Sequence, residues 1–135
     1  MDILNKDLVT DVFGAWPSFH DAEVLSLELQ RGRKSNKQCV LNAAVNCYTV
    51  KTINEGTADF DTVLDKDYVI ALEFHGVEQL YIEGFNHQNV IDDIEMSDCN
   101  GVTNVEFISI FGVCCKFTCK DIAVLSVKSM TEFNA

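Results

Sequence analysis

Hydrophobic and polar residues alternate along most of the chain with the period of two that is typical of half-buried β-strands. Leu25, Leu27 and Leu29 alternate with polar residues, and large apolar residues occupy every second position from Tyr68 to Phe74. Because successive side chains of a strand point to opposite faces, one face of each segment can be buried. Comparable segments occur at 39–50, 80–82, 90–96, 105–117 and 122–127. The pattern therefore predicts about seven or eight strands.

Glycines indicate how some of these strands follow one another. Gly76 separates two apolar runs and predicts a hairpin between residues 68–74 and 80–82. Residues 105–117 are expected to form one long strand, bent or bulged near Gly112. No sustained amphipathic helix separates the strand segments, so we expect antiparallel neighbours rather than parallel strands with helical crossovers.

Only the N-terminal part of the chain has helical spacing. Apolar residues within 3–14 recur every three or four positions, and Gly14 favours an ending there. The polar stretches 31–37 and 54–67 are expected to be a turn and an exposed loop. We therefore expect a single domain over residues 1–135 that is mainly β. It should be a curved antiparallel sheet, a sandwich or a partly closed barrel with a short N-terminal helix.

The charge of the chain is strongly negative and unevenly distributed. With 21 acidic and 10 basic side chains, the formal net charge at pH 7 is −11. From Glu55 to Glu106 there are 13 acids and one base, Lys66. Such a chain repels phosphate backbones and anionic membrane surfaces, so neither nucleic acid nor a membrane is an expected partner. A basic protein is the natural complement.

Ten acids of this middle segment are predicted to form an acidic face that binds the partner. They are Asp59, Asp61, Asp65, Asp67, Glu78, Glu83, Asp92, Asp93, Glu95 and Asp98. One alternative is that they only keep the outer face of a sheet soluble, but such surfaces usually mix both signs. A calcium site over 92–98 is another alternative, and it lacks the ligand spacing and glycine of a calcium loop.

The six cysteines are expected to be reduced thiols, most of them buried. The N-terminus lacks the basic start and apolar run of a secretory signal, and disulfide frameworks are typical of secreted proteins. No apolar run is long enough for a transmembrane helix. Strand alternation places Cys115 and Cys119 on one face and Cys114 on the other. No Cys-x-x-Cys pair exists, so we predict neither a metal nor a cofactor, and a cytoplasmic location.

Candidate chemistry is limited to His20 and its neighbours. A carboxylate such as Asp21 can orient an imidazole for acid–base work, but adjacent strand residues point apart unless the chain turns there. The nucleophile elbow, the phosphate-binding glycine loop and the His-Glu-x-x-His zinc helix are all missing from the sequence. We therefore predict no enzyme. A small enzyme or ligand-binding domain that uses His20, Asp21 and Glu23 remains the alternative.

Residues 16–24 read Trp-Pro-Ser-Phe-His-Asp-Ala-Glu-Val, with a proline that stiffens the segment between two aromatic residues. We interpret this segment as a structural clasp that closes one end of the sheet. The segment also resembles the immunity protein 50 family of bacterial polymorphic-toxin systems. The resemblance continues in order through Phe-His-Gly-Val at 74–77, Gly-Phe-Asn-His-Gln-Asn-Val-Ile at 84–91 and Phe-Thr-Cys at 117–119.

The resemblance covers the chain from about residue 13 to residue 127 and implies a small, cytoplasmic, mainly β protein that neutralises a cognate toxin. It transfers no catalytic residues. Residues of the family motifs that are expected to form the clasp or part of the contact surface are Trp16, Pro17, Phe19, His20, Asp21, Glu23, Phe85, Asn86, Gln88 and Asn89.

Charge and resemblance together predict an immunity protein that blocks a basic toxin domain by steric and electrostatic occlusion, without catalysis. If the toxin is a nuclease, the acidic face could occupy its basic groove in place of nucleic acid. A self-assembling structural β protein is a third possibility, and the sequence does not predict an oligomeric state.

Overall fold

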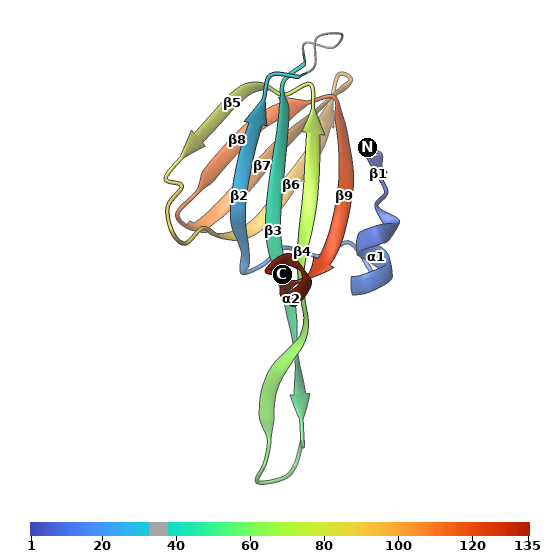
Figure 1. Cartoon of the computed structure of the whole chain (residues 1–135), viewed down its shortest axis with the longest axis vertical. Coiled ribbons are helices and arrows are strands. Elements are labelled where there is room, and N and C mark those ends of the chain that lie inside the picture. The colour runs from blue at the N-terminus through green and yellow to red at the C-terminus, as the bar shows by residue number, and fades with distance from the viewer. Residues whose placement is uncertain (33–37) are drawn as a thin grey trace.

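The structure, a computed structural model, describes residues 1–32 and 38–135. Within these residues nine strands form one continuous sheet and two short helices lie beside it (Figure 1). The strands are β1 (Ile3–Leu4), β2 (Ala22–Gln30), β3 (Val40–Ile53), β4 (Asp61–His75), β5 (Glu78–Glu83), β6 (Val90–Cys99), β7 (Val102–Phe111), β8 (Cys114–Cys119) and β9 (Asp121–Ser129). The helices are α1 (Asp7–Phe13) and α2 (Met130–Phe133). The mainly β prediction is confirmed.

The strand order in the sheet is β1-β9-β4-β3-β2-β6-β7-β8-β5. All neighbouring strands are antiparallel except β1 and β9, which pair in parallel through Ile3–Leu4 and Ile122–Ala123. The sheet stays open in the described part of the chain, with β1 and β5 as its two edges. It is therefore a curved sheet, one of the three arrangements expected from the sequence.

The sheet curves so strongly that its two halves face each other. In Figure 1, the half formed by β6, β7, β8 and β5 crosses behind the half formed by β2, β3, β4 and β9. Phe74 of β4 meets Phe117 of β8 with ring centroids 4.9 Å apart, and Phe107 of β7 at 6.3 Å. Both contacts are edge to face, the geometry that aromatic rings favour. The core is the space between these two layers.

The two layers are joined where β2 pairs with β6. This junction has only two residue pairs, Ala22 with Ile91 and Glu23 with Val90. Just beyond it, Leu25 is an extra residue in β2, since Val24 pairs with Val45 and Ser26 pairs with Ala44. The bulge changes which side chains of β2 face the core.

The N-terminal helix is shorter than the sequence indicates. α1 begins at Asp7, while residues 3–4 belong to β1. The predicted ending at Gly14 is confirmed: Gly14 has φ 82° and its N–H donates to the carbonyl of Thr10. Val9 is the one fully buried residue of α1. Neither described helix is long and apolar enough to cross a membrane.

Two predictions that rest on glycines are wrong: the hairpin around Gly76 and the single long strand over residues 105–117. β5 does not pair with β4; it crosses to the second layer and pairs with β8, for example Tyr81 with Lys116. Residues 105–117 form two strands, because Gly112 with φ 85° turns the chain between β7 and β8. The apolar pattern continues through the turn, since Val113 within it is also buried. Hydrophobicity alone therefore could not reveal the change of direction.

The expected loop 54–67 is a loop only in its first part. Residues 61–67 extend β4 and pair with residues 48–53 of β3. β3 pairs with β2 only up to Asn46, and β4 pairs with β9 only from Tyr68 onward. Residues 49–66, here called the arm, therefore form a two-stranded hairpin that projects beyond the sheet (Figure 1). The polar turn expected at 31–37 lies largely outside the described residues.

Candidate functional site

The segment from Trp16 to Asp21 turns sharply between α1 and β2. Phe19 and Asp21 both have positive φ, 61° and 64°, which L-residues rarely adopt. The ring of Phe19 is 1% exposed and packs edge-on against Trp16 at 5.7 Å. The ammonium of Lys6 lies 5.7 Å from the Trp16 ring centroid, within cation–π distance. Pro17 lines a small hollow beside these rings.

The turn points His20 away from the core. Its Nδ1 lies 2.6 Å from Oδ1 of Asp92, and its Nε2 lies 3.5 Å from Oδ2 of Asp21. Asp92 reaches His20 from a bulge of β6, since Ile91 pairs with Ser109 and Asp93 with Ile108. The hydrogen bond to Asp92, aided by the charge of Asp21, raises the pKa of His20. The side chain is 62% exposed, so this charged cluster lies in solvent.

Asn89 connects three parts of the fold. Its side chain is 2% exposed, and its Oδ1 accepts the backbone N–H groups of Asn86 and Val113 at 2.9 and 3.2 Å. Its Nδ2 donates to the carbonyls of Asn86 and Val24, the latter at a long 3.4 Å. The β5–β6 connection, the β7–β8 turn and β2 are thus held at one point.

The other motif residues surround this point. Asn86 accepts the N–H of Gln88 at 2.9 Å and donates to the carbonyl of Gly84 at 3.0 Å. Glu23 takes part in the junction between the layers, and Phe85 is largely exposed. A side chain at Gly112 would stand 2.4 Å from the carbonyl oxygen of Gln88, too close for any other residue.

The ten acids predicted to form one face fall into three groups. Asp59, Asp61 and Asp65 lie on the arm, with Asp67 at its base. Glu78 and Glu83 lie at the β5 edge of the sheet, far from the arm in strand order. Asp92, Asp93, Glu95 and Asp98 follow one another along β6. The structure therefore does not gather them on a single face.

Some of these acids already have partners within the chain. Asp67 accepts a hydrogen bond from Asn46 at 2.8 Å, and Asp92 is hydrogen-bonded to His20. Asp98 lies 2.8 Å from the ammonium of Met1, which together with a hydrogen bond from Thr103 lowers the pKa of its carboxyl group. These acids serve local structure at least in part.

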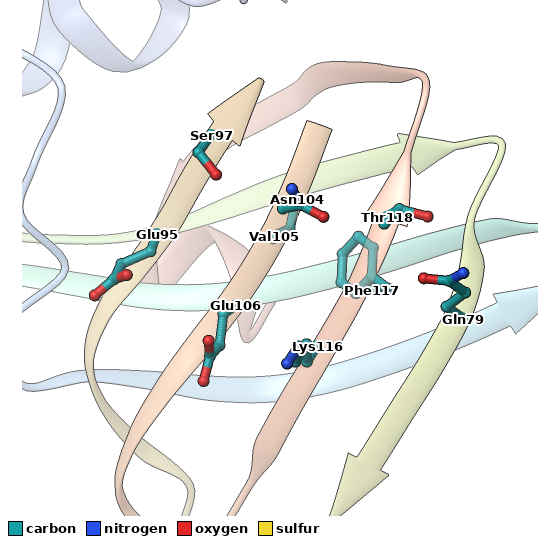
Figure 2. Close-up of a pocket in the computed structure, with 9 residues that line it drawn as sticks. All are labelled: Gln79, Glu95, Ser97, Asn104, Val105, Glu106, Lys116, Phe117 and Thr118. Carbon is teal, nitrogen blue, oxygen red and sulfur yellow. The ribbon is translucent and has the colours of Figure 1, made fainter. Parts of the chain in front are cut away.

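A hollow of about 310 Å³ lies on the outer face of the second layer, lined by residues of β5, β6, β7 and β8 (Figure 2). Glu95 of β6 and Glu106 of β7 stand directly opposite each other, and Lys116 of β8 is the next residue across. Like charges on directly opposed strand residues repel. Lys116, directly opposite Glu106 on β8, offsets part of this repulsion, although it forms no ion pair with a described residue.

Neither Glu106 nor Lys116 is predicted as a site residue from the sequence. The position of Glu106, however, follows from a turn motif in the sequence. Asn100 and Gly101, with φ 51° and 83°, form the two-residue hairpin turn that Asn-Gly favours. This turn pairs Cys99 with Val102 and therefore Glu95 with Glu106. Lys116 could not be found in this way, because the pairing of β7 with β8 depends on the unforeseen turn at Gly112.

The described residues contain no cluster of His, Cys, Asp and Glu with the arrangement of a metal site. All six cysteines are free. Cys47, Cys115 and Cys119 are buried, and Cys114 is exposed, as strand alternation predicts; Cys99 is also exposed. Burial raises the pKa of Cys47 to about 11, that of Cys119 to about 11 and that of Cys115 to about 12. At neutral pH these three thiols are protonated and poorly nucleophilic.

A comparison with protein families gives one match that covers nearly the whole chain. The family model described as Immunity protein 50 matches residues 5–130. No curated protein matches the chain, and no solved structure matches it either. The matched range includes every strand except β1, as well as α1, the clasp segment and the arm.

Proposed function

Because the chain belongs to the immunity protein 50 family, we propose that it binds a cognate bacterial toxin domain and blocks it without catalysing a reaction. The toxin domain is proposed to be basic, and the encounter to take place in the bacterial cytoplasm. Occlusion needs a rigid surface that complements the toxin in shape and charge.

The observation that carries this proposal is the pair of opposed glutamates beside the hollow of the second layer. Glu95 and Glu106 repel each other across β6 and β7. A cationic side chain from a partner would remove that repulsion and gain from both carboxylates. The two carboxylates side by side are therefore proposed as the contact point for a basic side chain of the toxin domain.

The motif residues are proposed to serve the scaffold rather than the contact surface. Phe19 and Asn89 are buried, and the side chain of Asn86 forms hydrogen bonds with the neighbouring backbone. By tying the layers together, these residues keep the outer face of the sheet in a fixed shape. A preorganised surface loses less entropy on binding.

The enzyme alternative has one observation in its favour, the hydrogen bond between His20 and Asp92. A carboxylate that orients an imidazole is a common catalytic arrangement. However, Cys47 lines the hollow beside His20, and its raised pKa makes it a poor nucleophile. The exposed imidazole also lacks the exclusion of water that strengthens catalytic electrostatics.

The proposed function is tested with a candidate toxin domain, taken from a reading frame adjacent to this one and purified separately. We expect a stable complex, inhibition of the toxin, and an association rate constant that falls steeply with salt. Reversing the opposed pair with Glu95→Lys and Glu106→Lys should lower the association rate constant by about tenfold or more at low salt. Unchanged association in this variant would reject the electrostatic mechanism.

A matched control separates local charge from net charge. Glu28→Lys with Glu132→Lys changes the net charge by the same amount at exposed positions on β2 and α2. It should slow association much less. A further variant addresses the enzyme alternative. If His20 only supports the scaffold, His20→Ala should still inhibit the toxin. A His20→Ala variant that folds normally but no longer inhibits the toxin would count against a scaffold role for His20.

A further inference from the structure

We propose that the arm, residues 49–66, is a second contact with the toxin domain, separate from the Glu95–Glu106 surface, and that its apolar outer face fills an apolar pocket that has a basic rim. This inference rests on the proposed function and adds the contacting element and the chemistry of the site it fits. It follows from the geometry, the exposed side chains and the charges of the arm.

The arm projects from the sheet without support from other strands. Each of its two strands pairs only with the other, and about five residues on each side extend it by roughly 15–20 Å. A two-stranded ribbon is marginally stable by itself in water. Nothing in the fold of the sheet requires this extension, because the core ends near Cys47 and Tyr68.

The outer face of the arm carries exposed apolar side chains. Val50 and Leu64 stand directly opposite each other and are both 57% exposed. Tyr48, two residues before Val50 on the same face of β3, continues this surface toward the sheet. Phe60 at the tip is 56% exposed. Clustered exposed apolar residues of this kind mark interaction sites more often than isolated ones do.

The tip is held in shape by its own hydrogen bonds. Thr57 Oγ1 donates to the carbonyl of Asn54 at 2.7 Å, and Asn54 Nδ2 donates to the carbonyl of Asp59 at 3.2 Å. The backbone N–H of Phe60 donates to the carbonyl of Thr57. Phe60 is therefore presented on an ordered turn, which reduces the entropy lost on binding.

The charges of the arm identify the chemistry of its partner. Asp59 and Asp61 flank Phe60 in sequence, and neither forms an ion pair with a described residue. The one ion pair within the arm joins Lys51 to Asp65 at 3.6 Å. Unpaired carboxylates on both sides of an exposed aromatic ring complement an apolar pocket bordered by Lys or Arg.

The test removes the apolar surface while keeping the arm. In a triple variant with Val50→Thr, Leu64→Thr and Phe60→Ser, both strand positions carry threonine, a β-branched residue that suits a strand. The probe is the same candidate toxin domain that tests the proposed function. We expect its affinity for the variant to fall by about 10- to 100-fold, because a few central apolar residues usually dominate an interface. Unchanged affinity would overturn the inference.

A second triple variant is the matched control. Leu29→Thr, Leu125→Thr and Leu4→Ser remove similarly exposed apolar side chains from β2, β9 and β1. This control should bind as the unaltered chain does. An equal loss of affinity in both variants would show that general surface hydrophobicity, rather than the arm, drives binding.

Two further measurements distinguish the remaining outcomes. Amide hydrogen exchange of residues 49–53 and 61–66 should slow when the toxin domain binds, and unchanged exchange there would overturn the inference. Light scattering of the chain alone tests for self-association: a dimer that the arm variant converts to a monomer would assign the arm to a second copy instead. Failure of the unaltered chain to bind the toxin domain would overturn the proposed function itself.

Discussion

The two ends of the β3–β4 hairpin have similar apolar patterns and opposite surroundings. Near the sheet, Val45 and Ile70 stand opposite each other and are completely buried between the layers. On the arm, Val50 and Leu64 stand opposite each other and are more than half exposed. The difference arises because Val45 and Ile70 point into the space between the two layers, whereas Val50, five residues further along β3, points to the outer face. One end therefore contributes to folding, whereas the other is available for binding.

The largest loss of stability is expected for a substitution in the core between the two layers. Phe117→Ala removes a ring that packs against Phe74 at 4.9 Å and Phe107 at 6.4 Å. The free energy of unfolding should fall by about 3–5 kcal/mol, measured by urea denaturation. Phe133→Ala, on the exposed helix α2, is the control and should have a small effect. Equal effects of the two substitutions would contradict the description of the core.

A somewhat smaller loss is expected at the point that ties the layers together. Asn89→Ala leaves the N–H groups of Asn86 and Val113 without their acceptor. The free energy of unfolding should fall by about 2–4 kcal/mol, because buried unpaired donors are costly. Asn104→Ala, at an exposed position of β7, should change it little. A thermal melt that shifted equally in both variants would show that Asn89 has no special role.

The arm should tolerate the replacement of its apolar residues with little loss of stability. Val50→Thr with Leu64→Thr should alter the free energy of unfolding by no more than about 0.5–1 kcal/mol, since both side chains already face solvent. Val45→Thr should cost more than this pair, because it buries a hydroxyl group in the core. If the arm variant were the less stable of the two, the arm would be part of the folding core.

The smallest effect concerns the exposed His20. Since Asp92 raises the pKa of His20 in the folded protein, this ion pair adds stability below pH about 6.5 and the addition is lost as the pH rises through the folded-state pKa. An NMR titration should show the pKa of His20 falling in Asp92→Asn. Asp93→Asn, which removes the neighbouring carboxylate, should leave it close to its original value.

The sequence predicts those parts of the fold that depend on local alternation and local turns. The burial of Cys115 and Cys119 but not Cys114 follows from alternation, and the register of β6 with β7 follows from Asn100-Gly101. The pairing of β5 with β8 does not follow, because it depends on how the sheet curves rather than on neighbouring residues.

The candidate site was predicted less completely for the same reason. A count of acids locates an acidic segment, but the strand order divides it among the arm, β5 and β6. The contact between His20 and Asp92, 72 residues apart in sequence, needs both a turn at His20 and a bulge at Asp92. Val50 lies on the face of β3 opposite to Val45 and Cys47, so alternation alone turns it outward, but its pairing with Leu64 on a projecting arm became visible only in the structure.

The narrow junction between β2 and β6 also bears on how the polypeptide acquires its native state. Hairpins such as β6–β7 connect adjacent segments and can form early, whereas Asn89 and Val24, which meet beside the junction, are 65 residues apart. Bringing such distant segments together carries a loop-closure entropy that local hairpins avoid. Docking of the two preformed halves is therefore the step expected to limit the rate of folding.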